Sequence, residues 1–263
     1  MITIKATHEF EKMAIAGACV ADVLRTVRAE ARVGVSMLEL DEVAAGVLRS
    51  RDCTPSFLGY HGFPARICAS PNHVIVHGIP DRYRLKDGDI LSIDAGAIYE
   101  GYHGDAAITF AVGEVPAQVQ DLIDTTEQAL WAGIAQVRPG ARLGDIGSAV
   151  KEVGAGAGYG VVHEYVGHGI GRQMHEDPQV PNHGTPGKGL KLRTGMSICI
   201  EPMFNLGTAE TRVMPDGWTV VTADGGLSAH FEHTIALTEE GTKVLTLAEK
   251  DAKAGFVQTA LGG

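Results

Sequence analysis

The stretch Ile90-Leu-Ser-Ile-Asp94-Ala-Gly-Ala-Ile-Tyr99-Glu100-Gly101-Tyr-His-Gly-Asp105 opens with alternating apolar residues, and it continues as Ala106-Ala-Ile-Thr-Phe-Ala-Val112. Two β-rich runs around Glu100-Gly101 predict a hairpin with a two-residue turn. Asp94 and Asp105 are eleven positions apart, and we expect them on one face of the hairpin, directly opposite each other. Like charges so placed repel, whereas a divalent cation between them would turn repulsion into ligation. Two solvated carboxylates on an open face are the simpler interpretation, and the rest of the chain decides between the two.

The composition is that of an ordinary globular protein. The 263 residues are 44% hydrophobic and carry a net charge of −10 with no basic block, which gives no electrostatic help for binding nucleic acid or anionic membranes. The four cysteines show no paired spacing, and the chain has neither a signal-peptide pattern nor an apolar run of membrane-spanning length. We therefore expect a cytoplasmic monomer with reduced cysteines, no membrane span and no nucleic-acid partner.

Helices and strands do not alternate strictly, which favours an α+β fold with antiparallel sheet. Besides the hairpin, capping signals and apolar periodicity predict helices at about 7–32, 36–50, 116–137 and 143–153, and strands at about 65–69, 74–76, 197–204, 219–222 and 229–237. Residues 52–64 and the glycine- and histidine-rich stretch 154–189 read as loops. We expect one domain over residues 1–250, with halves at about 1–115 and 116–250, followed by a C-terminal tail at 251–263.

An internal repeat supports the division into halves. The ten residues from Leu85 to Asp94 align without gaps on those from Leu192 to Glu201, and His77-Gly-Ile79 precedes the first copy as His168-Gly-Ile170 precedes the second. Two matches in the same order indicate a duplicated unit, in which each half supplies a histidine and a strand that ends in an acid.

Acids from both halves should therefore converge. Asp94, Asp105, Glu201 and Glu232 end or interrupt apolar strands, and a carboxylate buried there without a partner would cost several kcal/mol. With a histidine from the stretch that contains His168 and His175, they form an oxygen-rich set suited to Mn(II), Fe(II) or Co(II). Four negative charges match two divalent ions, so the residues predict a two-metal hydrolase. Amides and phosphate esters both remain open as substrates. Eight other histidines are interpreted as structural: His8, His61, His73, His103, His163, His183, His230 and His233.

A series of motifs, taken in order, resembles the methionine aminopeptidase family over about residues 3–245. These are Tyr60-His-Gly-Phe-Pro, His77-Gly-Ile-Pro, Ile93-Asp94, His103-Gly-Asp105, Gly167-His168-Gly-Ile-Gly-Arg, His175-Glu-Asp-Pro-Gln-Val, Ile200-Glu201-Pro-Met and Phe231-Glu232-His-Thr. Only 31 positions separate Glu201 from Glu232, which leaves no room for the type II insertion and indicates the short, bacterial-style type I form. The resemblance implies the pita-bread α+β fold, with two pseudo-symmetric halves and a curved antiparallel sheet covered by helices.

The resemblance also implies a role for each site residue. Asp94 would chelate one metal ion, Asp105 and Glu232 would bridge both ions, and His168 and Glu201 would complete the ligand set of the other ion. The ions would be Co, Mn or Fe(II), with Zn and Ni as alternatives. Glu201 would also act as general base, His175 would stabilise the oxyanion of the scissile carbonyl, and His77 would contact the peptide nitrogen and assist the leaving amine. The methionine pocket would be lined by Tyr60, Phe63, Cys68, Met174 and Trp218.

The implied activity is removal of the initiator methionine from nascent proteins and peptides whose second residue is small. A transient association with the ribosome would suit that substrate, although no basic patch supports it. Alternatives are an X-Pro aminopeptidase or prolidase, which usually carries an added N-terminal domain; a non-catalytic pita-bread binding protein, which would lack metal ligands; and a phosphoesterase, for which Arg172 is the only basic residue near the motifs. Met174, His73 and Val76 depart from common family residues and bear on fine specificity.

The second residue of this chain gives a direct test. A large side chain at that position would clash at the mouth of the pocket, so Ile2 predicts that the protein keeps Met1. The measurement is the intact mass of the protein expressed in a bacterial cytoplasm, where a mass short by one methionine residue would contradict the expectation.

Overall fold

A long antiparallel hairpin runs through the middle of the fold. In the computed structural model, which describes residues 2–247, strands β4 (Asp89–Tyr99) and β5 (Tyr102–Val112) pair from end to end. The turn residues Glu100 and Gly101 both have positive φ, 47° and 79°, the conformation that matches the twist of a two-residue hairpin. The predicted hairpin is confirmed.

The register differs from the expectation. Asp94 lies opposite Ala107 and Asp105 lies opposite Gly96, so the two acids are diagonal neighbours rather than directly opposite. A turn at positions 100 and 101 pairs residues whose numbers add to 201, as 94 and 107 do, whereas 94 and 105 add to 199. The shift of two positions keeps both acids on the same face, as predicted, and leaves more room between them.

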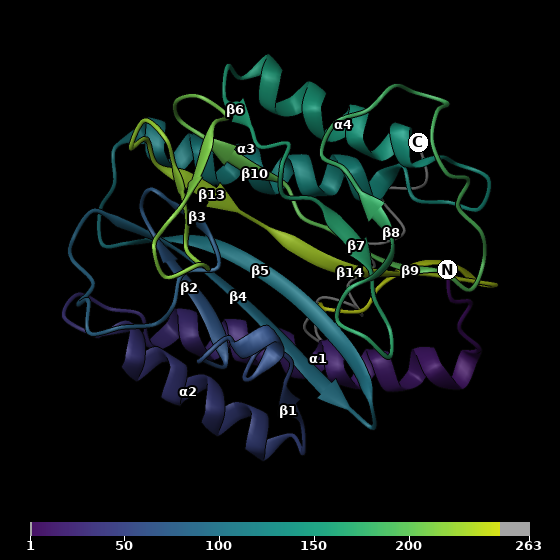
Figure 1. Ribbon diagram of the computed structural model, residues 1–263, viewed down its shortest axis with the longest axis horizontal. Helices are drawn as coiled ribbons and strands as arrows, with labels where there is room; N and C mark the ends of the chain where they lie inside the picture. The colour runs from purple at the N-terminus through teal and green to yellow at the C-terminus, as the bar shows by residue number, and fades with distance from the viewer. Residues whose placement is uncertain (1, 248–263) are drawn as a thin grey trace.

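The hairpin belongs to a curved nine-stranded sheet in which every pair is antiparallel (Figure 1). The order is β1-β4-β5-β14-β9-β7-β8, with β2 beside β4 and β15 beside β14. Two three-stranded sheets flank it, in the orders β13-β10-β6 and β11-β12-β3. The bounds are β1 Thr54–Pro55, β2 Ile67–Pro71, β3 Val74–Val76, β6 Gly160–Val161, β7 Gly167–Gly169, β8 Glu176–Val180, β9 Ser197–Ile200, β10 Met203–Asn205, β11 Thr211–Val213, β12 Val220–Thr222, β13 Ser228–His230, β14 Glu232–Thr238 and β15 Gly241–Val244.

Two strands that the sequence predicted as continuous are each broken. The stretch 197–204 divides into β9 and β10 at Glu201-Pro202, where proline offers no N–H to a ladder, and 229–237 divides into β13 and β14 at Phe231. Strands β9 and β14 pair in the large sheet, whereas β10 and β13 pair in a small one. The chain therefore passes between sheets at the points where Glu201 and Glu232 lie.

Four helices pack against the sheet as predicted. Figure 1 shows α1 and α2 along one part of the sheet and α3 and α4 along the other, with bounds Thr7–Glu30, Met37–Ser50, Ala117–Ala135 and Leu143–Gly156. The capping box that opens α2 is confirmed, because Ser36 Oγ accepts the Glu39 N–H at 3.3 Å and Glu39 accepts the Ser36 N–H at 2.8 Å. A short 3₁₀ turn, η1 (Tyr60–Gly62), interrupts the loop before β2.

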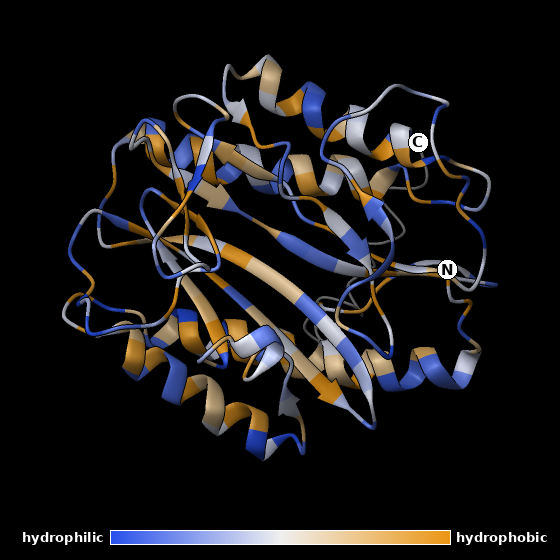
Figure 2. Ribbon diagram, viewed as in Figure 1, coloured by the Kyte–Doolittle hydropathy of each residue, from blue (hydrophilic) through white to orange (hydrophobic). Residues whose placement is uncertain are grey.

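Each helix pair covers its own hydrophobic cluster. One cluster joins α1 and α2 to the hairpin through residues such as Leu24, Leu40 and Ile93, and the other joins α3 and α4 to β9 and β14. Figure 2 shows the change along β5 from hydrophilic residues near the turn to apolar residues at its far end.

Several short strands were not predicted. Strands β6, β7 and β8 lie in the stretch interpreted as loop, and β11 and β15 were missed because three- and four-residue strands carry little periodic signal. No helix among residues 2–247 is long and apolar enough to span a membrane. The expected tail at 251–263 lies outside the described residues.

One substitution made in two helices should have opposite effects on stability. At Gly17 of α1 a Cβ would lie 2.2 Å from the carbonyl oxygen of Leu245, whereas at the exposed Gly46 of α2 it would meet nothing within 4 Å. We expect Gly17→Ala to destabilise the fold by about 1–3 kcal/mol through overpacking. Gly46→Ala should stabilise it by about 0.5–1 kcal/mol, because alanine loses less backbone entropy in a helix. Urea unfolding measures both, and equal signs would contradict the packing described for α1.

Candidate metal centre and adjoining pocket

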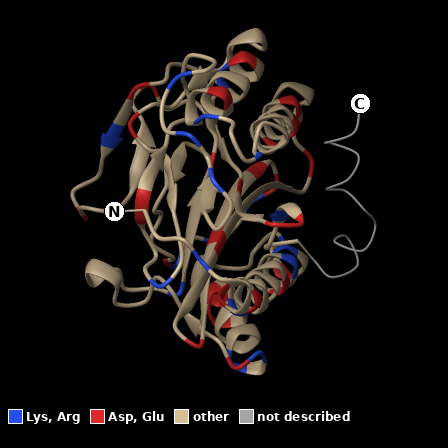
Figure 3. Ribbon diagram, turned by 90° about the vertical axis from the view of Figure 1, so that its right-hand side faces the viewer, with Lys and Arg blue, Asp and Glu red and all other residues tan. Residues whose placement is uncertain are grey.

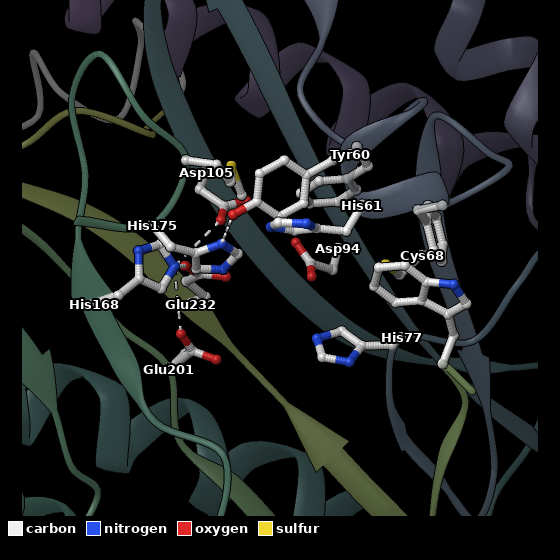
Figure 4. Close-up of a pocket in the computed structure, with 14 residues that line it drawn as sticks. Tyr60, His61, Cys68, His77, Asp94, Asp105, His168, His175, Glu201 and Glu232 are labelled. Atoms are coloured by element: carbon white, nitrogen blue, oxygen red, sulfur yellow. Dashed lines mark hydrogen bonds and ion pairs between the residues drawn. The ribbon is translucent and has the colours of Figure 1, made fainter. Parts of the chain in front are cut away.

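All twelve residues that the sequence singled out line one cavity of about 320 Å³ (Figure 4). The lining consists of Tyr60, Phe63, Cys68, His77, Asp94, Asp105, His168, Met174, His175, Glu201, Trp218 and Glu232, together with Phe57 and His61, which were not predicted. His73 and Val76 lie outside this set. The acids lie near His168 and His175, whereas His77 packs against Trp218 of the apolar part of the lining.

The four acids reach the cavity from two sources. Asp94 and Asp105 project from the central hairpin, whereas Glu201 and Glu232 project from the breaks between sheets. Figure 3 shows acidic positions on the strands in the middle of the molecule as well as on the helices. Asp105 and Glu232 are only 2% exposed, so neither charge is solvated by bulk water.

The surroundings favour the protonated forms of these four acids. Burial raises the pKa of Asp94 to about 7. Burial and repulsion by neighbouring carboxylates raise the pKa values of Asp105, Glu201 and Glu232 well above their usual range. Such a cluster favours any cation that can offset the repulsion.

The side chain of His168 points one ring nitrogen at the acids. Its Nδ1–H donates to the carbonyl oxygen of Gly169 at 2.8 Å, which leaves the Nε2 lone pair free. Nε2 lies 3.8 Å from Asp105 Oδ2, 3.7 Å from Glu201 Oε1 and 4.0 Å from Glu232 Oε1. These are not ion pairs, because burial and the neighbouring His175 lower the pKa of His168 to about 3 and the ring is neutral. A lone pair that faces three carboxylates is the arrangement of a metal ligand set.

Unsatisfied atoms give an independent test of fit. Asp94 Oδ1, Asp105 Oδ1 and Glu232 Oε1 are buried and have no hydrogen-bond partner among the described residues. Ligand atoms of Asp105, His168, Glu232 and Cys199 lie within 4.8 Å of one another. Burial raises the pKa of the Cys199 thiol well above its usual range, so its sulfur is protonated and the oxygens dominate the set. The residues present therefore fit a divalent cation with a preference for oxygen and nitrogen.

Two further histidines flank the acids. His175 lies beside His168, with ring centroids 4.3 Å apart, and its Nδ1 is 2.7 Å from the Tyr60 hydroxyl. His77 follows β3 with φ of 59°, a left-handed conformation that is costly for a non-glycine residue and typical of functional positions. Burial lowers the pKa of His77 to about 4, so the ring is neutral near pH 7 and can both donate and accept a hydrogen bond.

The apolar end of the cavity is a compact cluster. Phe63 contacts Trp218 edge to face at 5.2 Å and Phe57 at 6.4 Å between ring centroids. Cys68 and Met174 are buried in the same cluster and add two polarizable sulfur atoms. An unbranched apolar side chain that contains sulfur suits such a pocket.

Sequence reasoning missed residues that contact this centre. His230, interpreted as structural, is 2% exposed, and its Nε2 lies 4.0 Å from Glu201 Oε2 with no hydrogen-bond partner among the described residues. The available signal was strand alternation, since His230 is two positions before Glu232 and a continuous strand would place both on one face. His61 gave no such signal, because it lines the cavity from a 3₁₀ turn with φ of 47°.

Neutralising one acid should separate stability from metal binding. We expect Asp105→Asn to stabilise the metal-free protein near neutral pH by about 1 kcal/mol, because it removes a buried carboxyl that must either take up a proton or repel its neighbours. The folded-state pKa of Asp94 lies above its ordinary 3.8, so the stability of metal-free protein should fall as pH rises towards and through about 7, less steeply in the variant.

The same variant should gain less than wild type from Mn(II), which adds about 2.7 kcal/mol at a free concentration of 100 Kd. Urea unfolding with EDTA or Mn(II), between pH 5 and 8, measures both effects. Glu164→Gln, at an exposed position, is the matched control. A metal-free Asp105→Asn protein less stable than wild type at pH 7.5 would contradict the repulsion.

Comparison with known proteins agrees with this geometry. The profile of metallopeptidase family M24 matches residues 11–239. Methionine aminopeptidase 1 of Mycobacterium tuberculosis is 50% identical over 250 residues, which cover 92% of this chain and 94% of that protein. Methionine aminopeptidase 1 of Bacillus subtilis is 45% identical over 246 residues, which cover 94% and 99%.

Solved structures extend the comparison to the fold. The crystal structure of methionine aminopeptidase from Thermotoga maritima superposes with a TM-score of 0.92 at 44% identity, covering 94% of this chain and 100% of that chain. Prolidase from Pyrococcus furiosus, with a TM-score of 0.76 at 23% identity over 94% of this chain and 66% of that one, shares the fold. This chain belongs to metallopeptidase family M24.

Proposed function

We propose that this protein is a methionine aminopeptidase that removes the initiator methionine from nascent proteins and peptides with a small second residue. One observation carries the proposal: a single cavity of about 320 Å³ joins a buried acid and histidine cluster to an apolar pocket with two sulfur-containing side chains. Relatives named methionine aminopeptidase at 44–50% identity support it, whereas the prolidase is 23% identical.

Five residues would hold the metal: Asp94, Asp105, His168, Glu201 and Glu232. Four carboxylates carry four negative charges, so two divalent ions would neutralise the set, and its oxygen-rich character favours Mn(II), Fe(II) or Co(II). When bound, such ions polarise the scissile carbonyl and lower the pKa of water. Asp105 and Glu232 would be among the residues that hold the ions, and burial and neighbouring carboxylates raise their pKa values as they raise that of Glu201.

Glu201 would act as general base and take a proton from the attacking water. Its side chain is 13% exposed, compared with 3% for Asp105 and 2% for Glu232, so among these three acids it is the one that water reaches most readily. A carboxylate within hydrogen-bond reach of the nucleophilic water meets the geometric requirement for a general base.

His175 would donate a hydrogen bond to the carbonyl oxygen as negative charge develops on it. When the Tyr60 hydroxyl donates to Nδ1, the ring proton is on Nε2 and is available for that oxygen. His77 would contact the peptide nitrogen and assist departure of the amine. Edge-to-face contacts with Tyr165 and Trp218, at 5.8 and 6.3 Å between centroids, hold its ring.

Specificity would follow from the two ends of the cavity. The acidic end would hold the free N-terminal amine of the substrate, which restricts cleavage to the first residue. The pocket of Tyr60, Phe63, Cys68, Met174 and Trp218 would accept the thioether side chain. We further infer that residues 1–250 act as one catalytic domain, as a monomer, on new chains in the cytoplasm, where brief contact with the ribosome would suit the substrate.

Peptide hydrolysis tests the proposal. Metal-stripped protein reloaded with Mn(II), Co(II) or Fe(II) should release methionine from Met-Ala-Ser and leave Ala-Pro-Ala intact. Glu201→Gln should lower kcat by about 10²- to 10⁴-fold, because the base is lost. His163→Ala, at an exposed histidine outside the cavity, should leave kcat unchanged.

Other outcomes would point elsewhere. Cleavage of Ala-Pro-Ala in place of Met-Ala-Ser would assign the chain to the prolyl peptidases. Absence of cleavage of both peptides with every metal, despite metal binding, would favour a non-catalytic member of the family.

A further inference from the structure

A buried ion pair outside the cavity joins the beginning of the chain to the loop that carries His175. Lys5 Nζ lies 2.8 Å from Glu176 Oε2, and the two side chains are only 5% and 7% exposed. The residues are 171 positions apart. Glu176 directly follows His175 and begins β8.

Hydrogen bonds tie this pair to its surroundings. The Thr3 hydroxyl donates to Glu176 Oε2, and Lys5 Nζ donates to Thr3 Oγ1 at 2.5 Å. The other carboxylate oxygen, Oε1, accepts the Gln173 N–H at 3.2 Å. The Lys5 N–H donates to the carbonyl oxygen of Gly195 at 2.7 Å, which fixes the N-terminal segment beside β9 (Figure 1). Both oxygens of Glu176 are therefore occupied.

The loop itself leaves space for the pair. A Cβ on Gly171 would lie 2.5 Å from Lys5 Cε and 2.8 Å from Glu176 Oε1. Both side chains are buried and bonded, so they could not move aside without breaking the ion pair. The loop 171–176 is thus shaped around the Lys5 side chain.

On the side away from the first cavity, His168 and His175 border a second open space. A second cavity of about 730 Å³, lined by Thr3, Arg172, Gln173, Glu176 and others, shares His168 and His175 with the first. The two histidines therefore form a wall with space on both sides, and packing alone does not fix the position of His175.

We propose that Lys5 is a positioning residue that, through Glu176, holds His175 at the substrate carbonyl. The inference rests on the role proposed above for His175. The Lys5 ammonium group bonds to Thr3 and Glu176, and neither of these residues lines the first cavity. Its effect on the reaction would therefore pass through Glu176. Removing its charge would leave Glu176 buried without a cation and release the loop that bears His175 and Met174.

Lys5→Met tests this, because methionine keeps the apolar stem and removes the charge. We expect kcat for Met-Ala-Ser to fall about 10- to 100-fold with KM nearly unchanged, as for a small misplacement of a group that acts in the transition state. Amide hydrogen exchange at residues 172–176 should become about tenfold faster, while exchange in the central hairpin stays unchanged.

The matched control is Lys12→Met, which removes a cation from an ion pair of equal length, 2.8 Å, between side chains that are 33% and 56% exposed. That variant should change neither kcat nor exchange at 172–176. In a His175→Ala background, Lys5→Met should change kcat by no more than about twofold, because the positioned group is absent.

Three results would overturn the proposal: an equal loss of kcat in both backgrounds, faster exchange without loss of kcat, or no change in either. If Lys5→Met does not fold, Thr3→Val, at an exposed position, should show the same two effects at about threefold size, and no effect there overturns the proposal as well. If wild type cleaves no methionyl peptide, the proposed function fails, and the exchange data alone decide whether Lys5 orders the loop.

Discussion

Four carboxylates buried close together repel one another, and the architecture around them is arranged to tolerate that repulsion. Two unit charges 4 Å apart repel by about 4 kcal/mol at an effective dielectric constant of 20. Neighbouring carboxylates accordingly raise the pKa values of Asp105, Glu201 and Glu232 beyond what burial alone does. A fold that needed only stability would not gather these groups, so hairpin, strand breaks and histidines are best understood as the frame for a cation.

Much of this frame was predictable because its signals are local or repeated. The hairpin follows from strand alternation around Glu100-Gly101, and α2 from the reciprocal bonds of Ser36 and Glu39. The internal repeat pairs Asp94 with Glu201 in the sequence itself. The family resemblance then implied twelve site residues, and the fold brings all twelve to one cavity, together with Phe57 and His61.

What escaped prediction depends on contacts between distant parts of the chain. The break at Phe231 lies within a continuous apolar run, and only the change of sheet partner explains it. The approach of His230 to Glu201 follows from that break. Lys5 and Glu176 each look like ordinary surface charges in sequence, and their burial against each other has no local signal. The predicted register of the hairpin was wrong by two positions, because register depends on which residues form the turn rather than on residue type.

The two hydrophobic clusters described above give the metal centre a mechanical consequence. One cluster is built from residues 19–112 and the other almost wholly from residues 119–244, and each of these two spans supplies two of the four acids. Ions held by both Asp94 and Glu232 would join points 138 positions apart in the chain, since 232 − 94 = 138. Closing a loop of that length restricts the unfolded chain far more than a local contact does. The metal ions would thus serve as a removable crosslink that makes the parts of the chain around the two hydrophobic clusters unfold together.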